Sequence, residues 1–125
     1  MGKFLALSVI ILEPPKPVDE IKHGGCEQYA LDVQNEIGGQ YLYVSINPDL
    51  CPGDTERMTL GDVNYSQGTI DTWNNHVAVI NDGVVYDAMT GPDGIPLDEY
   101  KQMYTYNDVL NFTISDDPPK VPSDH

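Results

Sequence analysis

Basic side chains are scarce in this chain. Six Lys and Arg residues stand against 20 Asp and Glu residues, which gives a formal net charge of −14 at pH 7. A charge of this sign repels phosphate backbones and anionic membrane faces, so it argues against nucleic acid as a partner. The same charge favours a basic protein or a cationic peptide as a partner, although it equally serves solubility.

Cysteine is scarce as well. Cys26 and Cys51 are the two cysteines of the chain, so at most one disulfide can form. A bridge between them is the alternative to a reactive thiol, because sequence alone does not show whether two cysteines approach each other. His23, His76 and the two cysteines lack the close paired spacing of a structural zinc site. We therefore expect no metal and no cofactor.

Long apolar runs are missing too. The N-terminal run over residues 4–12 is far too short to span a bilayer, so no stable membrane span is expected. It follows a single lysine and resembles a short signal peptide, but residues 13–17 offer no small-residue cleavage site. A first strand or an interface segment is therefore an equal alternative. The location stays open between a secreted or delivered effector and a cytoplasmic protein.

A length of 125 residues with 40% hydrophobic composition fits one compact domain. Prolines at 14, 15 and 17 predict an extended linker, since each ring restricts its own backbone and that of the preceding residue. We expect residues 1–22 to form an apolar segment and a proline-rich linker, residues 23–115 the folded domain, and residues 116–125 a loose acidic tail.

Hydrophobic spacing predicts an α+β fold. Apolar or small residues recur at helical spacing from Cys26 to Ile37, and Gly38-Gly39 ends this helix. Residues 47–72 are rich in turn-forming types and predict a long irregular excursion, with a short element near 58–60, that forms one wall of a site. The remaining expected elements are strands over 41–46, 76–80, 84–88 and 109–114 and a helix over 97–104 whose inner side carries Leu97, Tyr100, Met103 and Tyr104.

The Asp82-Gly83 dipeptide favours a two-residue hairpin turn, because both residues tolerate positive backbone angles. Cross-strand partners share one face of a sheet, so this turn places His76 and Asp87 on the same face and within side-chain reach. A shift of the strand register by one residue would place the two side chains on opposite faces of the sheet. The pairs expected from this turn are Asn81–Val84, Ile80–Val85, Val79–Tyr86, Ala78–Asp87 and His76–Met89.

These residues predict a catalytic triad. A carboxylate beside a histidine orients the ring and stabilises its charged form, which leaves the other ring nitrogen to exchange a proton with a nucleophile. The expected nucleophile is Cys26, because unpaired N–H groups and the helix dipole at a helix start favour a thiolate. Gly24-Gly25 would let a substrate backbone come close, and the N–H of Cys26 is a natural oxyanion donor.

The segments 25–30, 75–79 and 82–91 resemble papain-fold cysteine hydrolases of the bacterial polymorphic-toxin and effector type, and the likeness covers roughly residues 23–104. The resemblance implies a papain-like domain with an N-terminal nucleophile helix packed on a small antiparallel sheet. It implies a protease or glutamine deamidase that uses Cys26, His76 and Asp87. The implied partners are a protein or peptide substrate and an immunity or inhibitor protein. Glu20, Lys22 and His23 stand where many such enzymes place an oxyanion Gln or Asn, so the second oxyanion donor is unassigned.

Two other functions compete with this hypothesis. An NlpC-type cell-wall peptidase shares the order of Cys and His, but Cys26 lacks the Asp-Cys-Ser-Gly signature usual there. A non-enzymatic module could instead bind a basic partner through an acidic face, with the three site residues serving only the fold. A reactive thiol would favour the enzymes over the module.

Overall fold

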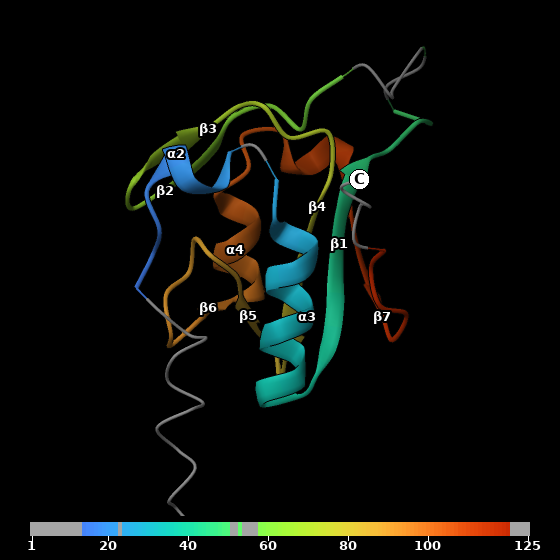
Figure 1. Cartoon of the computed structure of the whole chain (residues 1–125). Coiled ribbons are helices and arrows are strands. Elements are labelled where there is room, and N and C mark those ends of the chain that lie inside the picture. Colours follow the sequence, from blue (N-terminus) through green and yellow to red (C-terminus); the bar gives the residue numbers. More distant parts are fainter. Residues whose placement is uncertain (1–13, 23, 51–52, 54–57, 121–125) are drawn as a thin grey trace, which may run out of the picture.

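The computed structural model describes residues 14–22, 24–50, 53 and 58–120. It confirms the predicted α+β class, with a five-stranded antiparallel sheet in the order β6-β5-β4-β1-β7 (Figure 1). The helical elements are α2 (Val18–Ile21), α3 (Cys26–Ile37), α4 (Leu97–Gln102) and the 3-10 turn η2 (Asn107–Val109). The strands are β1 (Gln40–Ile46), β2 (Val63–Tyr65), β3 (Gly68–Ile70), β4 (His76–Asn81), β5 (Val84–Tyr86), β6 (Ile95–Pro96) and β7 (Leu110–Ser115).

Helix α3 has the limits that its sequence predicts. Its N-cap is Gly25 with φ 92°, and Gly38 with φ 79° caps its C-terminal end. Glycine tolerates these left-handed conformations at little cost, so the glycines on both sides set the two ends of the helix. Ala30 and Val33 form its buried face. The first residue of the helix is Cys26, so its thiol lies at the N-terminal end.

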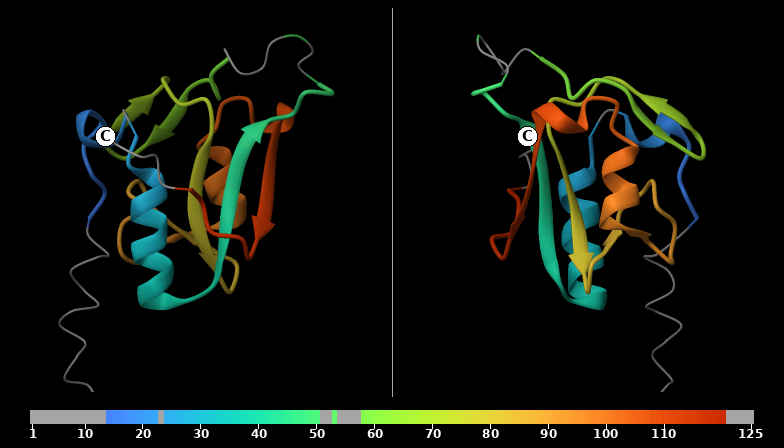
Figure 2. Two further views of the ribbon diagram at one scale, coloured as in Figure 1. Left: turned by 45° about the vertical axis from the view of Figure 1, so that its right-hand side comes forward. Right: turned by 180° about the vertical axis from the view of Figure 1, so that it is seen from behind.

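The sheet is covered on both faces, as the two further views in Figure 2 show. Helix α3 packs on one face, where Ala30 and Val33 contact Tyr41, Val77 and Val79. Helix α4 packs on the other face. The larger core cluster on that side contains Leu42, Val44 and Ile46 of β1, Ala78 and Ile80 of β4, and Tyr100, Met103 and Tyr104. The alternation predicted for residues 41–46 is therefore confirmed.

The predicted hairpin forms around Asp82 and Gly83, whose φ angles are 54° and 80°. The pairs Asn81–Val84, Ile80–Val85 and Val79–Tyr86 are confirmed.

Beyond Tyr86 the predicted register is wrong, because β5 ends there and the expected pairs Ala78–Asp87 and His76–Met89 do not form. Asp87 instead begins a turn in which its own Oδ1 accepts the N–H of Met89 at 2.8 Å. A side-chain acceptor of this kind replaces the ladder with a local turn.

The excursion after β1 contains a hairpin that the sequence did not predict. Strands β2 and β3 pair with each other, and their residues Val63 and Ile70 are buried in the larger core. The short element expected near 58–60 is absent, since residues 58–60 form neither helix nor strand. Leu60 is nevertheless buried, and its N–H donates to the carbonyl of Trp73 at 2.7 Å. The excursion therefore closes one end of the core.

The described parts of the two segments expected to lie outside the domain, residues 14–22 and 116–120, pack against it. Lys16 donates its N–H to the carbonyl of Ala88 at 2.9 Å, and Ile21 of α2 is buried in the larger core. At the other end, Gln40 donates to Asp116 at 3.1 Å and Tyr43 donates to the carbonyl of Asp117. Residues 14–22 and 116–120 therefore belong to the compact unit. Within the described part of the chain, no helix has the length and apolar character needed to cross a bilayer.

Candidate active site

His76 and Asp87 form a buried pair at the start of β4. Nε2 of His76 lies 2.9 Å from Oδ2 of Asp87, and each side chain is 3% exposed. His76 is the first residue of β4, and Asp87 is the first residue after β5. The turn at 82 and 83 therefore brings the two side chains together, as predicted, although Asp87 reaches His76 from a turn and not from the ladder.

The carboxylate of Asp87 accepts hydrogen bonds from three donors. Oδ2 accepts from Nε2 of His76 and, at 2.6 Å, from the hydroxyl of Tyr100, while Oδ1 accepts the N–H of Met89. Tyr100 in turn contacts the hydroxyl of Tyr104 at 2.9 Å, and both tyrosines are fully buried. An ionised carboxylate only accepts, so it suits a site where every neighbour donates. This network holds Asp87 in one orientation.

Burial lowers the pKa of His76, but the hydrogen bond to Asp87, the interaction with the Cys26 thiol and the charge of Asp87 outweigh burial and raise it to about 9. At neutral pH the ring is therefore an imidazolium, in which both nitrogens carry protons. Among the described residues, the buried Nδ1 of His76 has no hydrogen-bond partner. Nδ1 is the ring nitrogen available to Cys26.

Folding stability should decrease as pH rises above about 6.5. The pKa of His76 is about 9 in the fold and 6.5 for a free side chain, so the folded protein binds more protons between these values. The contribution of His76 is complete below pH 6.5 and is lost as pH rises through about 9. It amounts to roughly 3 kcal/mol of unfolding free energy. Urea unfolding at pH 6 and pH 9.5 measures this change, and the decrease should be much smaller in His76→Gln. An equal decrease in both proteins would contradict the assignment to His76.

The indole of Trp73 covers one face of the imidazole. The two rings stack with centroids 4.0 Å apart and an interplanar angle of 5°. The indole N–H donates to the carbonyl of Ile21 at 3.2 Å, which fixes the orientation of the ring. Trp73 is also part of the cleft wall. The stack restricts rotation of His76 and protects its bond to Asp87 from water.

Cys26 approaches His76 from the N-terminal end of α3. It is a half-buried free thiol, and its interaction with His76 contributes to the raised pKa of the ring. First-turn N–H groups of a helix have no acceptor within the helix. The sulfur therefore lies near both the imidazolium and the positive end of the helix. Cys51, the partner in the alternative disulfide, lies outside the described residues.

A cleft of about 140 Å³ opens at these residues. Cys26, His76 and Asp87 all line it, so the structure brings the three predicted site residues to one cavity. Lys16 and Glu20 also contribute to the wall. The remaining wall is mainly apolar and consists of Ile21, Gly24, Gly25, Tyr29, Trp73, Val77, Ala88 and Met89.

The second oxyanion donor, which the sequence leaves unassigned, is not supplied by the amide of Gln28, the glutamine nearest to Cys26 in the helix. Gln28 donates to Asp32 at 2.9 Å on the exposed side of α3, so its amide is engaged away from the cleft. Lys22 pairs with Asp19 at 3.1 Å. His23 lies outside the described residues. The N–H of Cys26 stays the expected oxyanion donor.

Sequence reasoning missed the role of Tyr100. Its spacing with Tyr104 on the inner side of the predicted helix signalled burial, but it did not signal contact with Asp87. The contact depends on α4 packing across the sheet, which no local pattern specifies.

Tyr100→Phe should lower the unfolding free energy by about 2 kcal/mol, because a charge-assisted hydrogen bond to Asp87 is lost. Tyr104→Phe is the matched control, since it removes a hydroxyl one step further away and should cost about 1 kcal/mol. Denaturant titration measures both values. If Tyr104→Phe is the more damaging variant, the hydroxyl of Tyr100 is not the main support of Asp87.

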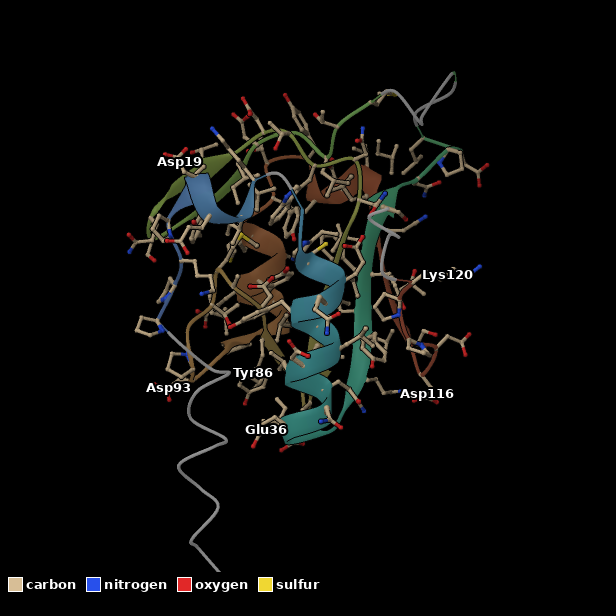
Figure 3. The ribbon with its side chains drawn as sticks, viewed as in Figure 1. Asp19, Glu36, Tyr86, Asp93, Asp116 and Lys120 are labelled. Carbon is tan, nitrogen blue, oxygen red and sulfur yellow. The ribbon has the colours of Figure 1, made fainter. Side chains whose placement is uncertain are left out.

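Two remaining questions from the sequence concern a metal site and the distribution of acidic side chains on the surface. No group of three or more His, Cys, Asp or Glu side chains that could hold a metal ion occurs within the described ranges. In the view of Figure 3, the side chains of Asp19, Glu36, Asp93 and Asp116 are well separated from one another.

Comparisons of this chain with protein-family models, with curated proteins and with solved structures found no match.

Proposed function

We propose that this protein is a cysteine hydrolase that cleaves amide bonds in a protein or peptide through Cys26, His76 and Asp87. The observation that carries the proposal is the buried 2.9 Å bond between His76 and Asp87, which leaves Nδ1 for a thiol in the same cleft. A nucleophile, a base and a group that orients the base are the minimum for covalent acyl transfer. The reaction needs no cofactor.

The proposed first half-reaction transfers the acyl group to the enzyme. The imidazolium of His76 stabilises the thiolate of Cys26, which attacks the amide carbonyl carbon. The N–H of Cys26 donates to the oxygen that becomes negative. Nδ1 of His76 then gives its proton to the leaving nitrogen, and the C–N bond breaks. The products are a thioester on Cys26 and a free amine.

The proposed second half-reaction hydrolyses the thioester. Neutral His76 takes a proton from water, and the resulting hydroxide attacks the thioester carbonyl. The C–S bond breaks, the acid leaves, and the thiolate and imidazolium are restored. Throughout the cycle Asp87 keeps Nε2 in place and stabilises the charge on the ring.

We also propose that the fold is papain-like and that the protein is of the toxin or effector type. The support is the order of elements, in which a helix bearing Cys26 comes before the antiparallel strand that begins with His76 and the hairpin that leads to Asp87. A toxin or effector of this kind would be neutralised by an immunity or inhibitor protein that covers the cleft.

Alkylation of the thiol separates this proposal from a binding module. At pH 7, iodoacetamide should modify Cys26 at least about tenfold faster than free cysteine, because the thiolate is the reacting form. Peptide mapping by mass spectrometry distinguishes Cys26 from Cys51. His76→Gln should reduce the rate toward that of free cysteine. A slow reaction of Cys26 in the folded protein would favour the module.

A further inference from the structure

Cys26 lies between two hollows of different chemistry. The first is the mainly apolar cleft of about 140 Å³ described above. The second, of about 330 Å³, shares Gly24, Cys26 and Trp73 with the cleft and is otherwise lined by Lys22, Glu27, Thr72, Asn74 and Asn75. A third hollow of about 240 Å³ shares Glu27 and Asn75 with the second and extends along β1 past Ser45 to Lys120. The third hollow also has apolar lining, from Val44, Val77 and Pro119. We call the second and third hollows together the polar groove, after the polar residues Glu27 and Asn75 that they share.

We propose that the substrate is an extended polypeptide that crosses Cys26, with the apolar cleft binding the chain on one side of the cleaved bond and the polar groove binding it on the other. This inference rests on the proposed function and chooses between its two reactions. The cleaved bond is a backbone peptide bond, and the leaving group is the amine of a peptide.

The volume of the polar groove supports a large leaving group. Deamidation of a glutamine side chain releases ammonia, which is close in size to water and needs about 30 Å³. The hollow of the polar groove that touches Cys26 is about 330 Å³. A deamidase needs no such space beyond its nucleophile, whereas an endopeptidase does.

The backbone next to Cys26 is open where the two hollows meet. Gly24 and Gly25 have φ angles of 116° and 92°, and a Cβ placed on either residue would meet no atom of the described residues within 4 Å. Packing therefore does not exclude side chains here, and the open space faces the cleft. A glycine pair exposes backbone N–H and C=O groups that can pair with the main chain of a peptide.

The polar groove offers the hydrogen-bonding groups that a peptide main chain requires. Asn75 lines both of its hollows and is exposed, and Ser45 adds a hydroxyl group. The hydroxyl of Thr72 donates to the carbonyl of Lys22 at 2.6 Å, so towards a peptide it can only accept. The neighbouring Asn74 donates to the carbonyl of Met58 at 2.7 Å, so its amide is partly engaged. Asn75 is therefore the position at which a bulky substitution would obstruct the polar groove.

The first test identifies the bond. Wild type and Cys26→Ala are each incubated with a proteome-derived peptide library, and the products are analysed by mass spectrometry. We expect new peptide termini that depend on Cys26. One-dalton gains at Gln without new termini would overturn the peptide-bond inference but leave the proposed function intact. If neither product depends on Cys26, the proposed function fails as well.

The second test addresses the polar groove. Two shortened substrates are made from a ten-residue peptide that the enzyme cleaves. One lacks the residues on the N-terminal side of the cleaved bond and the other those on the C-terminal side, except for the residue next to the bond. Each shortened substrate should have a kcat/KM about tenfold or more below that of the full peptide. Asn75→Trp should lower kcat/KM for the full peptide by a similar factor, with a smaller effect on the peptide that lacks the part bound in the polar groove. Asn35→Trp is the matched control, because Asn35 is exposed on α3 and lines none of these hollows. Equal effects of Asn75→Trp on all peptides, or no effect, would overturn the inference.

Discussion

Cys26→Ala is expected to abolish hydrolysis, with a loss of at least about 10⁴-fold in kcat/KM. The variant lacks the atom that forms the thioester, so no residual covalent pathway remains. Cys26→Ser should be nearly as inactive, since a serine hydroxyl is far harder to ionise beside the same histidine. Both variants should stay folded, because the side chain is half-buried and the change in size is small.

The measurement is kcat/KM on the peptide found with wild type, together with unfolding free energies that should differ from wild type by less than about 1 kcal/mol. Cys51→Ala is the matched control, because it removes the other thiol and should keep activity. Loss of activity in Cys51→Ala would favour the disulfide alternative. Activity retained in Cys26→Ala would exclude Cys26 as the nucleophile.

Asp87→Asn is expected to lower kcat about 10³- to 10⁴-fold while changing only one atom of the site. The carboxylate accepts from His76, Tyr100 and the N–H of Met89, and an amide group would direct an NH₂ donor at one of these donors. The imidazole would lose the partner that sets its orientation. The hydrogen bond and the charge of Asp87 both raise the pKa of His76, so the pKa should fall in this variant.

This variant should also lose about 3 kcal/mol of unfolding free energy, because one member of a buried pair is neutralised. Asp82→Asn is the control. It makes the same chemical change on the same hairpin, at an exposed residue with φ 54°, a conformation that Asn tolerates. It should change stability by less than about 0.5 kcal/mol. Equal losses in the two variants would mean that Asp87 has no special role.

The parts of the fold that local patterns determine were predictable. Helix α3 is enclosed by glycine pairs, β1 places every second residue from Leu42 to Ile46 in the larger core, and Asp82-Gly83 dictates the hairpin register up to Tyr86. The meeting of His76 and Asp87 follows from that register and was therefore predictable too. In contrast, α2 and the β2–β3 hairpin consist of elements with only three or four residues, and distant core contacts decide their formation.

The parts of the site that depend on long-range packing were not predictable in detail. The sequence predicted only from residue types that Cys26 lies close to His76. Their actual proximity depends on the path of the chain from α3 through β1 to β4, which local patterns do not specify. The hydroxyl of Tyr100 approaches Asp87 only because α4 lies across the opposite face of the sheet. The end of β5 at Tyr86 reflects the side chain of Asp87 bonding its own turn, which outweighs the tendency of the strand to continue.

The chain contains one tryptophan, and this tryptophan is stacked on the imidazole of His76. An imidazolium quenches indole emission more strongly than a neutral ring does, so the fluorescence of Trp73 follows the charge of His76 directly. The protein thus carries an intrinsic optical reporter beside His76. Proton movement at His76, and with it the acylation proposed for Cys26, can be tested by stopped-flow fluorescence without a dye, a label or a chromogenic substrate.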